Sequence, residues 1–327
     1  MLRDDGLPVR VIFDHVPDNL RARPTLSVTV EAAKAGARPA ALSYLTPGLG
    51  WAADYVALFD ERGGRIDVQG WVTLTNNSGT TYANANTLLV AGQVAQVNAN
   101  SGYQPYQPRP RGPVRAGTET AARERLGDFY LYPLKERTTI ANQQTKQVSF
   151  LEVSGAPARK AYEYRVGWLE SHDDPESADT VLKFSTSRAG GLGDALPAGT
   201  VRVYMKDARG QQQFVGENRI DHTPMGSDLA LKTGEAFDVK VKPVVEKREK
   251  IGPWRWRSTM RYTLTNARPQ PVTVELKQAG LDWVWMETRI VAESQKSERV
   301  SADATLWLVK VPANGEAVVT ATFETRF

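Results

Sequence analysis

Hydrophobic side chains recur at every second position along most of this chain, and this period constrains the fold more than any other feature. Residues 25–31 alternate in this way, and so do residues 55–59, 66–74 and 234–245. A period of two directs one side of an extended strand into a core and the other into water, whereas a helix repeats every 3.6 residues. The sequence therefore predicts an all-β fold of two or three β-sandwich modules of immunoglobulin-like type.

Turn-forming residues separate the strand-like runs. Residues 63–64 are both glycine, and residues 207–210 combine Asp with Gly, so each segment predicts a hairpin between its flanking strands. A weak repeat accompanies these turns, because residues 71–76 and 261–266 both alternate, end in Asn and lead through a loop into another strand. The repeat indicates two related modules.

One segment breaks the alternation. Residues 99–118 are rich in proline and polar side chains, which excludes a central strand or helix and predicts an exposed linker. Residues 118–126 follow as a short predicted helix. The predicted organisation is an incomplete N-terminal β module over 1–98, a Pro-rich linker with the short helix over 99–126, a central β-sandwich over 127–240 and a C-terminal immunoglobulin-like β-sandwich over 241–327.

The scarce residue types exclude several kinds of site. The chain has no cysteine, which removes disulfides, thiolate nucleophiles and cysteine zinc sites. Its three histidines, His15, His172 and His222, lie in different stretches without the spacing of a metal site. We therefore predict no metal centre and no cofactor.

Net charge and hydropathy indicate whether the chain binds nucleic acid or crosses a membrane. A net charge of +4 in 327 residues is too small an excess to indicate nucleic acid binding. No apolar run approaches the roughly 20 residues that span a bilayer, so no transmembrane segment is predicted. The first six residues lack the basic and then apolar pattern of a signal peptide. This start indicates a chain that begins inside a larger protein or at a late start site.

Three segments contain residue types of known catalytic or ligand sites, but we interpret each of them as an ordinary loop. Ser171, His172 and Asp173 are the residue types of a hydrolytic triad, but neighbours on an extended chain point in opposite directions and cannot assemble one. The carboxylates between residues 170 and 179 match no calcium-loop spacing, and we interpret them as a solvated acidic loop. The glycine-rich residues 190–194 lack the Lys and Ser/Thr of a phosphate loop. The sequence therefore predicts a protein that is not an enzyme.

The segment 247–257 is the strongest candidate for a binding surface. Basic residues interleave there with aromatic ones, so that on a strand Trp254 and Trp256 would share one face and Arg255 and Arg257 the other. Such a strand can bind anionic polysaccharide, lipid headgroups or nucleic acid through charge and stacking. The plainer interpretation, which we favour, is a strand with core tryptophans and solvated arginines.

A second pair of tryptophans, Trp283 and Trp285, repeats this period of two. Exposed coplanar indoles would indicate sugar binding, whereas buried indoles would be large core residues. The candidate binding residues are thus Trp254, Arg255, Trp256, Arg257, Trp283 and Trp285.

Two signatures carry a family resemblance. Residues 50–55 (GWAADY) lead into residues 70–82 (GWVTLTNNSGTTY), and residues 196–204 (LPAGTVRVY) lead through FVGE and IDHTP to residues 234–239 (GEAFDV). Over roughly residues 41–327 the chain resembles the bacterial family called domain of unknown function 4139, which is related to the mucoidy-inhibitor-like proteins. The resemblance implies a β-sandwich architecture and a protein of the bacterial envelope or periplasm. It brings no established catalytic residues, and such proteins usually carry a signal peptide and further N-terminal strands, which the first residues of this sequence do not lead us to expect here.

Three functional hypotheses follow. The main one is a non-enzymatic, envelope-associated β-sandwich scaffold or interaction protein that recognises partners through sheet edges and loops. The alternative is a carbohydrate-binding module that uses exposed tryptophans as stacking platforms. A second alternative is a hydrolase whose carboxylates come from distant loops. The expected partners are a protein or an anionic polysaccharide.

Overall fold

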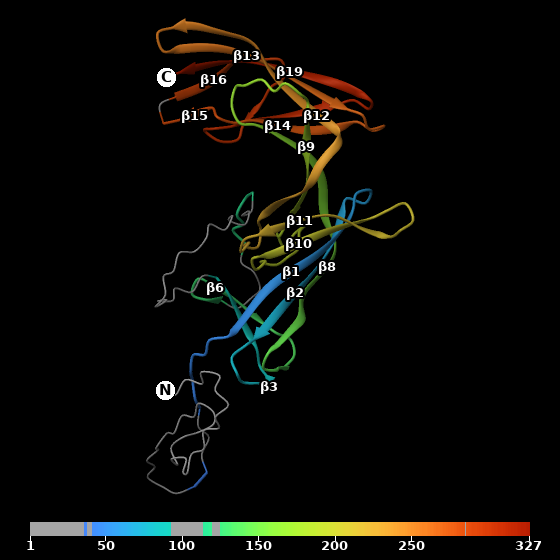
Figure 1. Ribbon diagram of the computed structural model, residues 1–327, viewed down its shortest axis with the longest axis vertical. Helices are drawn as coiled ribbons and strands as arrows, with labels where there is room; N and C mark the ends of the chain where they lie inside the picture. Colours follow the sequence, from blue (N-terminus) through green and yellow to red (C-terminus); the bar gives the residue numbers. More distant parts are fainter. Residues whose placement is uncertain (1–35, 38–40, 93–113, 120–124, 285) are drawn as a thin grey trace, which may run out of the picture. The chain divides into compact units, whose positions relative to one another are not determined.

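The structure is a computed structural model that describes residues 36–37, 41–92, 114–119, 125–284 and 286–327 (Figure 1). In these residues every regular element is a β-strand, which confirms the prediction of an all-β fold. None of their segments forms a helix that could span a membrane. The chain divides into two compact units, residues 1–45 and residues 46–327.

Some predicted elements lie outside the described residues. The strand expected over residues 25–31 and most of the proline-rich segment 99–118 are among them. The short helix expected over residues 118–126 is described only at its ends. There Arg125–Leu126 form strand β5, which pairs with Phe129–Pro133, strand β6, so the helix prediction is wrong at that end.

Two hairpins and a long strand form the first part of the fold. The glycines at residues 63–64 and the turn at residues 207–210 each join two antiparallel strands, which confirms both predicted hairpins. The first hairpin pairs in parallel with the second through β1 and β10. The strand order is β11-β10-β1-β2-β8, with β1 at Leu49–Asp60, β2 at Arg65–Asn76, β8 at Gln144–Val166, β10 at Gly199–Lys206 and β11 at Gln212–Ile220.

Strand β11 also lies against β12 (Asp228–Gly252), which follows β8 and β9 (Glu176–Ser185) in the strand order. The Asn218 side-chain amide donates a hydrogen bond to the Lys232 carbonyl oxygen at 3.3 Å. A methyl group on Gly216 would lie 2.1 Å from the Thr233 carbonyl oxygen, so only glycine allows this approach. The hydrophobic cluster enclosed here, the central core, includes Tyr55, Ile66, Val203, Ile220 and Leu231.

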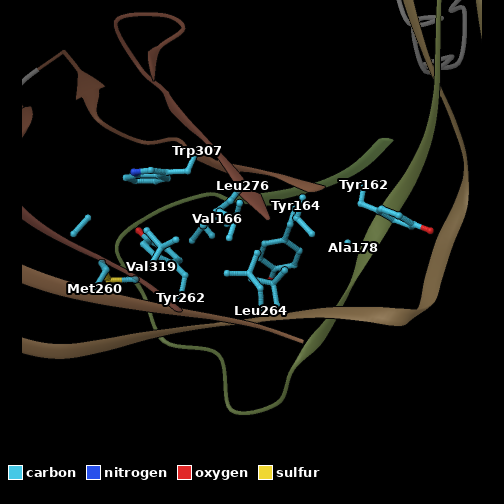
Figure 2. Packing of buried hydrophobic residues seen from close by; sticks show 14 of the residues in the cluster. Tyr162, Tyr164, Val166, Ala178, Met260, Tyr262, Leu264, Leu276, Trp307 and Val319 are labelled. Atoms are coloured by element: carbon cyan, nitrogen blue, oxygen red, sulfur yellow. The ribbon is translucent and has the colours of Figure 1, made fainter. Parts of the chain in front are cut away.

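A second cluster, the C-terminal core, lies between two sets of strands (Figure 2). Trp307 and Leu276 enter it from one set, and Met260 and Tyr262 enter it from the other. The first set contains β8, β14 (Val272–Gln278), β18 (Thr305–Val311) and β17 (Glu298–Arg299). The second set, called here the C-terminal sheet, has the order β9 (Glu176–Ser185), β12, β13 (Arg255–Asn266), β19 (Gly315–Arg326), β16 (Met286–Glu293) and β15 (Asp282–Trp283).

Strands β8 and β12 belong to both cores (Figure 1). In β12, Leu229 and Leu231 pack in the central core, whereas Val239 and Val241 pack in the C-terminal core. The strand therefore runs without a break through residue 240, where the sequence places a module border. The four-part division of the chain stays a prediction.

A smaller cluster packs beside the central core. Val72 and Leu74 of β2 contact Leu89, Tyr132 and Ile140, which come from three short strands. Tyr132 also donates a hydrogen bond to the Ala195 carbonyl oxygen at 3.0 Å. The short strands of this region are β3 (Tyr82–Ala85), β4 (Leu88–Ala91), β5, β6 and β7 (Thr138–Ile140).

The weak sequence repeat corresponds to one buried asparagine corner in each part of the fold. Asn76 ends β2, accepts a hydrogen bond from the amide two residues later and donates to the carbonyl four residues later. Asn266 ends β13 and makes the same two bonds. Each side chain also donates to a carbonyl of a distant segment, at Ile140 and Pro312 respectively. The repeat therefore reflects a shared way of ending a strand at a turn.

Candidate functional site

One end of the C-terminal sheet brings the candidate tryptophans together with arginines. Trp254 occupies the turn that precedes β13, and Trp283 is the last residue of β15. The two strands lie three spacings apart in the sheet, which corresponds to about 14 Å. The register places four charged residues in one row across this end, namely Arg255, Arg326, Glu287 and Asp282.

The indoles at this end are exposed. Trp254 is 71% exposed and Trp283 is 77% exposed, while Trp256 reaches 36%. The interpretation of these residues as core tryptophans is therefore wrong, because they stand at strand ends beyond the reach of the C-terminal core. The candidate Trp285 lies outside the described residues.

The prediction that Arg255 and Arg257 share one face of the strand is confirmed. Arg255 and Arg257 both direct their guanidinium groups to the carboxylate of Glu324 on β19. Trp254 and Trp256 do not act as a pair, because Trp254 borders a hollow with the arginines and Trp256 borders another one. The cause is the turn, since β13 begins only at Arg255 and Trp254 is outside its alternation.

The first hollow, called here the arginine hollow, has a volume of about 410 Å³. Its walls come from the β12–β13 turn, β16 and β19. It is lined mainly by Trp254, Arg255, Glu287, Arg289, Glu324 and Arg326.

Glu324 is the anchor of the arginine hollow, and its side chain is only 10% exposed. One of its oxygens accepts hydrogen bonds from Arg257 Nη2 at 2.6 Å and Nε at 3.2 Å. The other accepts a bond from Arg255 Nη2 at 2.8 Å and lies 3.6 Å from Arg289 Nη2. The hydrogen bonds from Arg257 and then Arg255 hold the pKa of Glu324 below its usual value. Glu324 therefore stays ionised and fixes the orientation of the guanidinium groups.

Positive charge exceeds negative charge around this carboxylate. Arg255, Arg257 and Arg289 share Glu324, although Arg257 also lies 4.0 Å from Glu249, and no carboxylate of the described residues lies within ion-pair distance of Arg326. Glu287 is the only other acidic residue that lines the hollow within the described part of the chain. Guanidinium groups that are not saturated by protein carboxylates bind carboxylate, sulfate or phosphate oxygens in a bidentate manner. The arginine hollow is thus suited to an oxyanion.

The second hollow, of about 330 Å³, lies near the same sheet end and has three aromatic residues in its lining. Trp168, Trp256 and Phe327 line it together with Arg248. Arg248 donates hydrogen bonds to the Leu169 carbonyl oxygen and, at 3.2 Å, to Ser258 Oγ. The sheet end therefore combines aromatic surface with arginine on both sides of Trp256.

Two of the residues considered for catalysis, Ser171 and His172, make contacts within and beside their own loop. Ser171 Oγ accepts a hydrogen bond from the Val245 amide at 2.8 Å. His172 Nδ1 lies 2.9 Å from Glu176 Oε1, and the other oxygen of that carboxylate, Oε2, accepts a hydrogen bond from the Tyr164 hydroxyl at 2.8 Å. Burial and this bond raise the pKa of Tyr164. In the part of the chain that the structure describes, no group of His, Asp or Glu is arranged to hold a metal ion.

Sequence reasoning missed most of the arginine hollow. Glu324 and Arg326 lie on β19, and Arg289 lies on β16, far from the 247–257 segment in sequence. Each follows the period of two in its own strand, but only the register between strands places them beside Arg255. The available signal was a pair of opposite charges, Glu324 and Arg326, two residues apart at the end of the final strand.

A scan of the chain against protein-family models finds no match, and neither does a search of the curated proteins.

Proposed function

We propose that this protein is a non-enzymatic, envelope-associated interaction scaffold of bacteria whose contact surface is the exposed aromatic end of the C-terminal sheet. The proposal includes membership of the family called domain of unknown function 4139 and an immunoglobulin-like β-sandwich arrangement around each core. The single observation that carries the binding role is the exposure of Trp254 and Trp283 at the same end of one sheet. Exposed apolar side chains that gather in one area mark binding surfaces more often than scattered ones do, and tryptophan is among the residues that contribute most to binding energy.

The surrounding structure supports this role. The contact surface rests on hydrogen-bonded strands whose core side chains, such as Tyr262 and Phe323, are fully buried. A surface on rigid strands loses little conformational entropy when a partner binds. Phe327, which is 55% exposed, adds to the aromatic area, because its amide is bonded to the Trp254 carbonyl oxygen.

A carbohydrate-binding role is the second candidate, and one observation favours it. Trp254 is well exposed and also lines a hollow, which is the arrangement that a stacking platform for a sugar ring needs. The scaffold and carbohydrate proposals share the same surface and differ in the kind of partner.

The hydrolase alternative receives less support from this surface. Glu287 and Glu324 both line the arginine hollow, but a glycosidase needs one carboxyl group with a raised pKa to act as the acid. Glu324 does not fit the part of the acid, because hydrogen bonds from Arg257 and then Arg255 lower its pKa and occupy both of its oxygens. The surface therefore offers more to a binding role than to catalysis.

Retention of the purified chain on an insoluble bacterial envelope fraction tests the proposal. We expect the chain to sediment with the fraction and Trp254→Ala and Trp283→Ala each to weaken retention several-fold. Phe237→Ala is the matched control, because Phe237 is 87% exposed and lies beside Asn266, at the opposite end of β13. Equal retention of all four proteins, or none for the unmodified chain, would contradict the proposal.

A further inference from the structure

We infer that the arginine hollow binds a carboxylate-bearing sugar unit of an acidic polysaccharide, with the carboxylate on the arginines and the sugar ring against Trp254. The inference rests on the proposed function and names the chemistry of its partner. It combines two features that occur at one place, a cluster of incompletely neutralised arginines and an exposed indole.

The arginines supply the recognition of the anion. Arg257 uses Nε and Nη2 on one oxygen of Glu324, and its Nη1 lies 4.0 Å from Glu249, so it is the most fully paired of these arginines. Arg255 uses only one nitrogen on Glu324, and Arg289 is too far from it, at 3.6 Å, for a good hydrogen bond. Arg289 and Arg255 therefore have donors left for a ligand, and their side chains are 67% and 48% exposed.

Glu324 acts as a positioning residue. Its carboxylate holds Arg255 and Arg257 on one side of the sheet, so that the guanidinium groups are oriented before a ligand arrives. A ligand carboxylate would then meet a site whose rotamers are already ordered, which reduces the entropy cost of binding. Arg326 extends the positive charge along the same strand, two residues from Glu324.

Trp254 supplies the recognition of a ring. Its indole borders the hollow from the turn, next to Arg255, and most of it faces water. The C–H groups on one side of a pyranose pack well against such a face. An anion without a ring, such as sulfate, would use the arginines and leave this face uncovered, which is why a sugar acid fits the surface better.

Affinity electrophoresis or titration calorimetry of the full chain with polygalacturonate tests the inference. We expect polygalacturonate to bind, neutral dextran not to bind, and added salt to weaken the binding. Arg289→Ala and Trp254→Ala should each weaken binding about tenfold, the loss of one charge-assisted bond or one stacked ring. Both side chains are exposed, so an unchanged melting temperature verifies that the variants fold.

Arg261→Ala is the matched control. Arg261 lies on the same strand and sheet face as Arg257, but it pairs with Glu246 outside the hollow, and its removal changes the net charge equally. We expect its binding to match that of the unmodified chain. A loss equal to that of Arg289→Ala would reduce the effect to general charge attraction and overturn the inference.

Two further comparisons show whether the ligand group is a carboxylate and whether a failure concerns only this inference or also the proposed function. Dextran sulfate that binds as tightly as polygalacturonate, with the same dependence on Trp254, would overturn the assignment to a carboxylate. If polygalacturonate fails to bind while retention on the envelope fraction still depends on Trp254 and Trp283, only this inference is wrong. If both fail, the proposed function is wrong as well.

Discussion

Asn266 joins three segments of the chain through one buried side chain. Its amide donates to the Gln270 and Pro312 carbonyl oxygens at 2.9 Å each, and its oxygen accepts from the Arg268 amide at 3.0 Å. Removing it leaves three backbone groups without a partner near the C-terminal core. Polar side chains of this kind are therefore as important for the fold as the apolar residues beside them.

We predict that Asn266→Ala lowers the free energy of unfolding by about 2–4 kcal/mol, because buried polar groups lose their hydrogen bonds. Urea unfolding of the variant and the unmodified chain measures this difference. Gln270→Ala is the control, since that side chain is exposed, and it should change stability by less than about 0.5 kcal/mol. Equal effects of the two substitutions would contradict the role of the corner.

The low pKa of Glu324 predicts a pH-dependent contribution to stability. A carboxyl group whose pKa is lowered by folding stabilises the protein above its unfolded value of about 4.5. That stabilisation is lost as the pH falls through the folded pKa. The unmodified chain should therefore be more stable than Glu324→Gln at neutral pH, and the difference should shrink below about pH 4.5.

Thermal unfolding of both proteins between neutral and acidic pH measures the effect. In an Arg257→Ala background the difference should be smaller, because Arg257 is the largest cause of the shift. A difference that is independent of pH, or one that grows on acidification, would contradict the ion-pair geometry.

At the residue scale the sequence predicts which side chains share a strand face better than it predicts their burial. The alternation of Trp and Arg in 247–257 marks the segment, and the structure places Arg255 and Arg257 on one face. The exposure of Trp254 could not be predicted, because it depends on where β13 begins. Arg289 and Glu324 join the site only through pairing across β16 and β19, which is a long-range property.

Strand β8 shows what alternation predicts and what it misses. The pattern indicates two separate runs, over residues 146–153 and 161–168, whereas the structure has one strand of 23 residues. Gly155, with a φ of 69°, lies at a register shift between β8 and β2. A bulge of this kind resets the alternation without ending the strand, so the sequence pattern looks interrupted.

The contact between β11 and β12 depends on Gly216. We predict that Gly216→Ala lowers the free energy of unfolding by about 2–4 kcal/mol, because the added methyl group would overlap the Thr233 carbonyl and strain a φ of 151°. Gly234→Ala is the matched control, because its methyl group would meet open space at an ordinary φ. Chemical denaturation of both variants measures the difference, and a Gly216→Ala protein as stable as Gly234→Ala would refute the close approach.

At the scale of the whole molecule, residues 46–327 contain two cores that share β8 and β12. Strands that pass through both cores cannot lose one set of contacts without weakening the other. We therefore expect the two cores to unfold together, in contrast to modules joined by a flexible linker.

Leu276→Ala tests this coupling, since Leu276 is fully buried in the C-terminal core and its loss should cost about 2–5 kcal/mol. We predict faster hydrogen exchange of the slowest amides in β1 of the central core as well as in β13. Leu308→Ala, at an exposed position of β18, should change neither. Faster exchange confined to β13 would show that the cores unfold independently.

The central claim is that the exposed aromatic end of the C-terminal sheet contacts the partner, and tryptophan oxidation with N-bromosuccinimide tests it most directly. Mass spectrometry would follow the oxidation of Trp254, Trp283 and the buried Trp307 in the free chain and in the chain bound to the envelope fraction. We predict fast oxidation of Trp254 and Trp283 in the free chain, strong protection of both when bound, and slow oxidation of Trp307 in each state. Oxidation of Trp254 and Trp283 at the same rate in the free and bound chain would contradict the account.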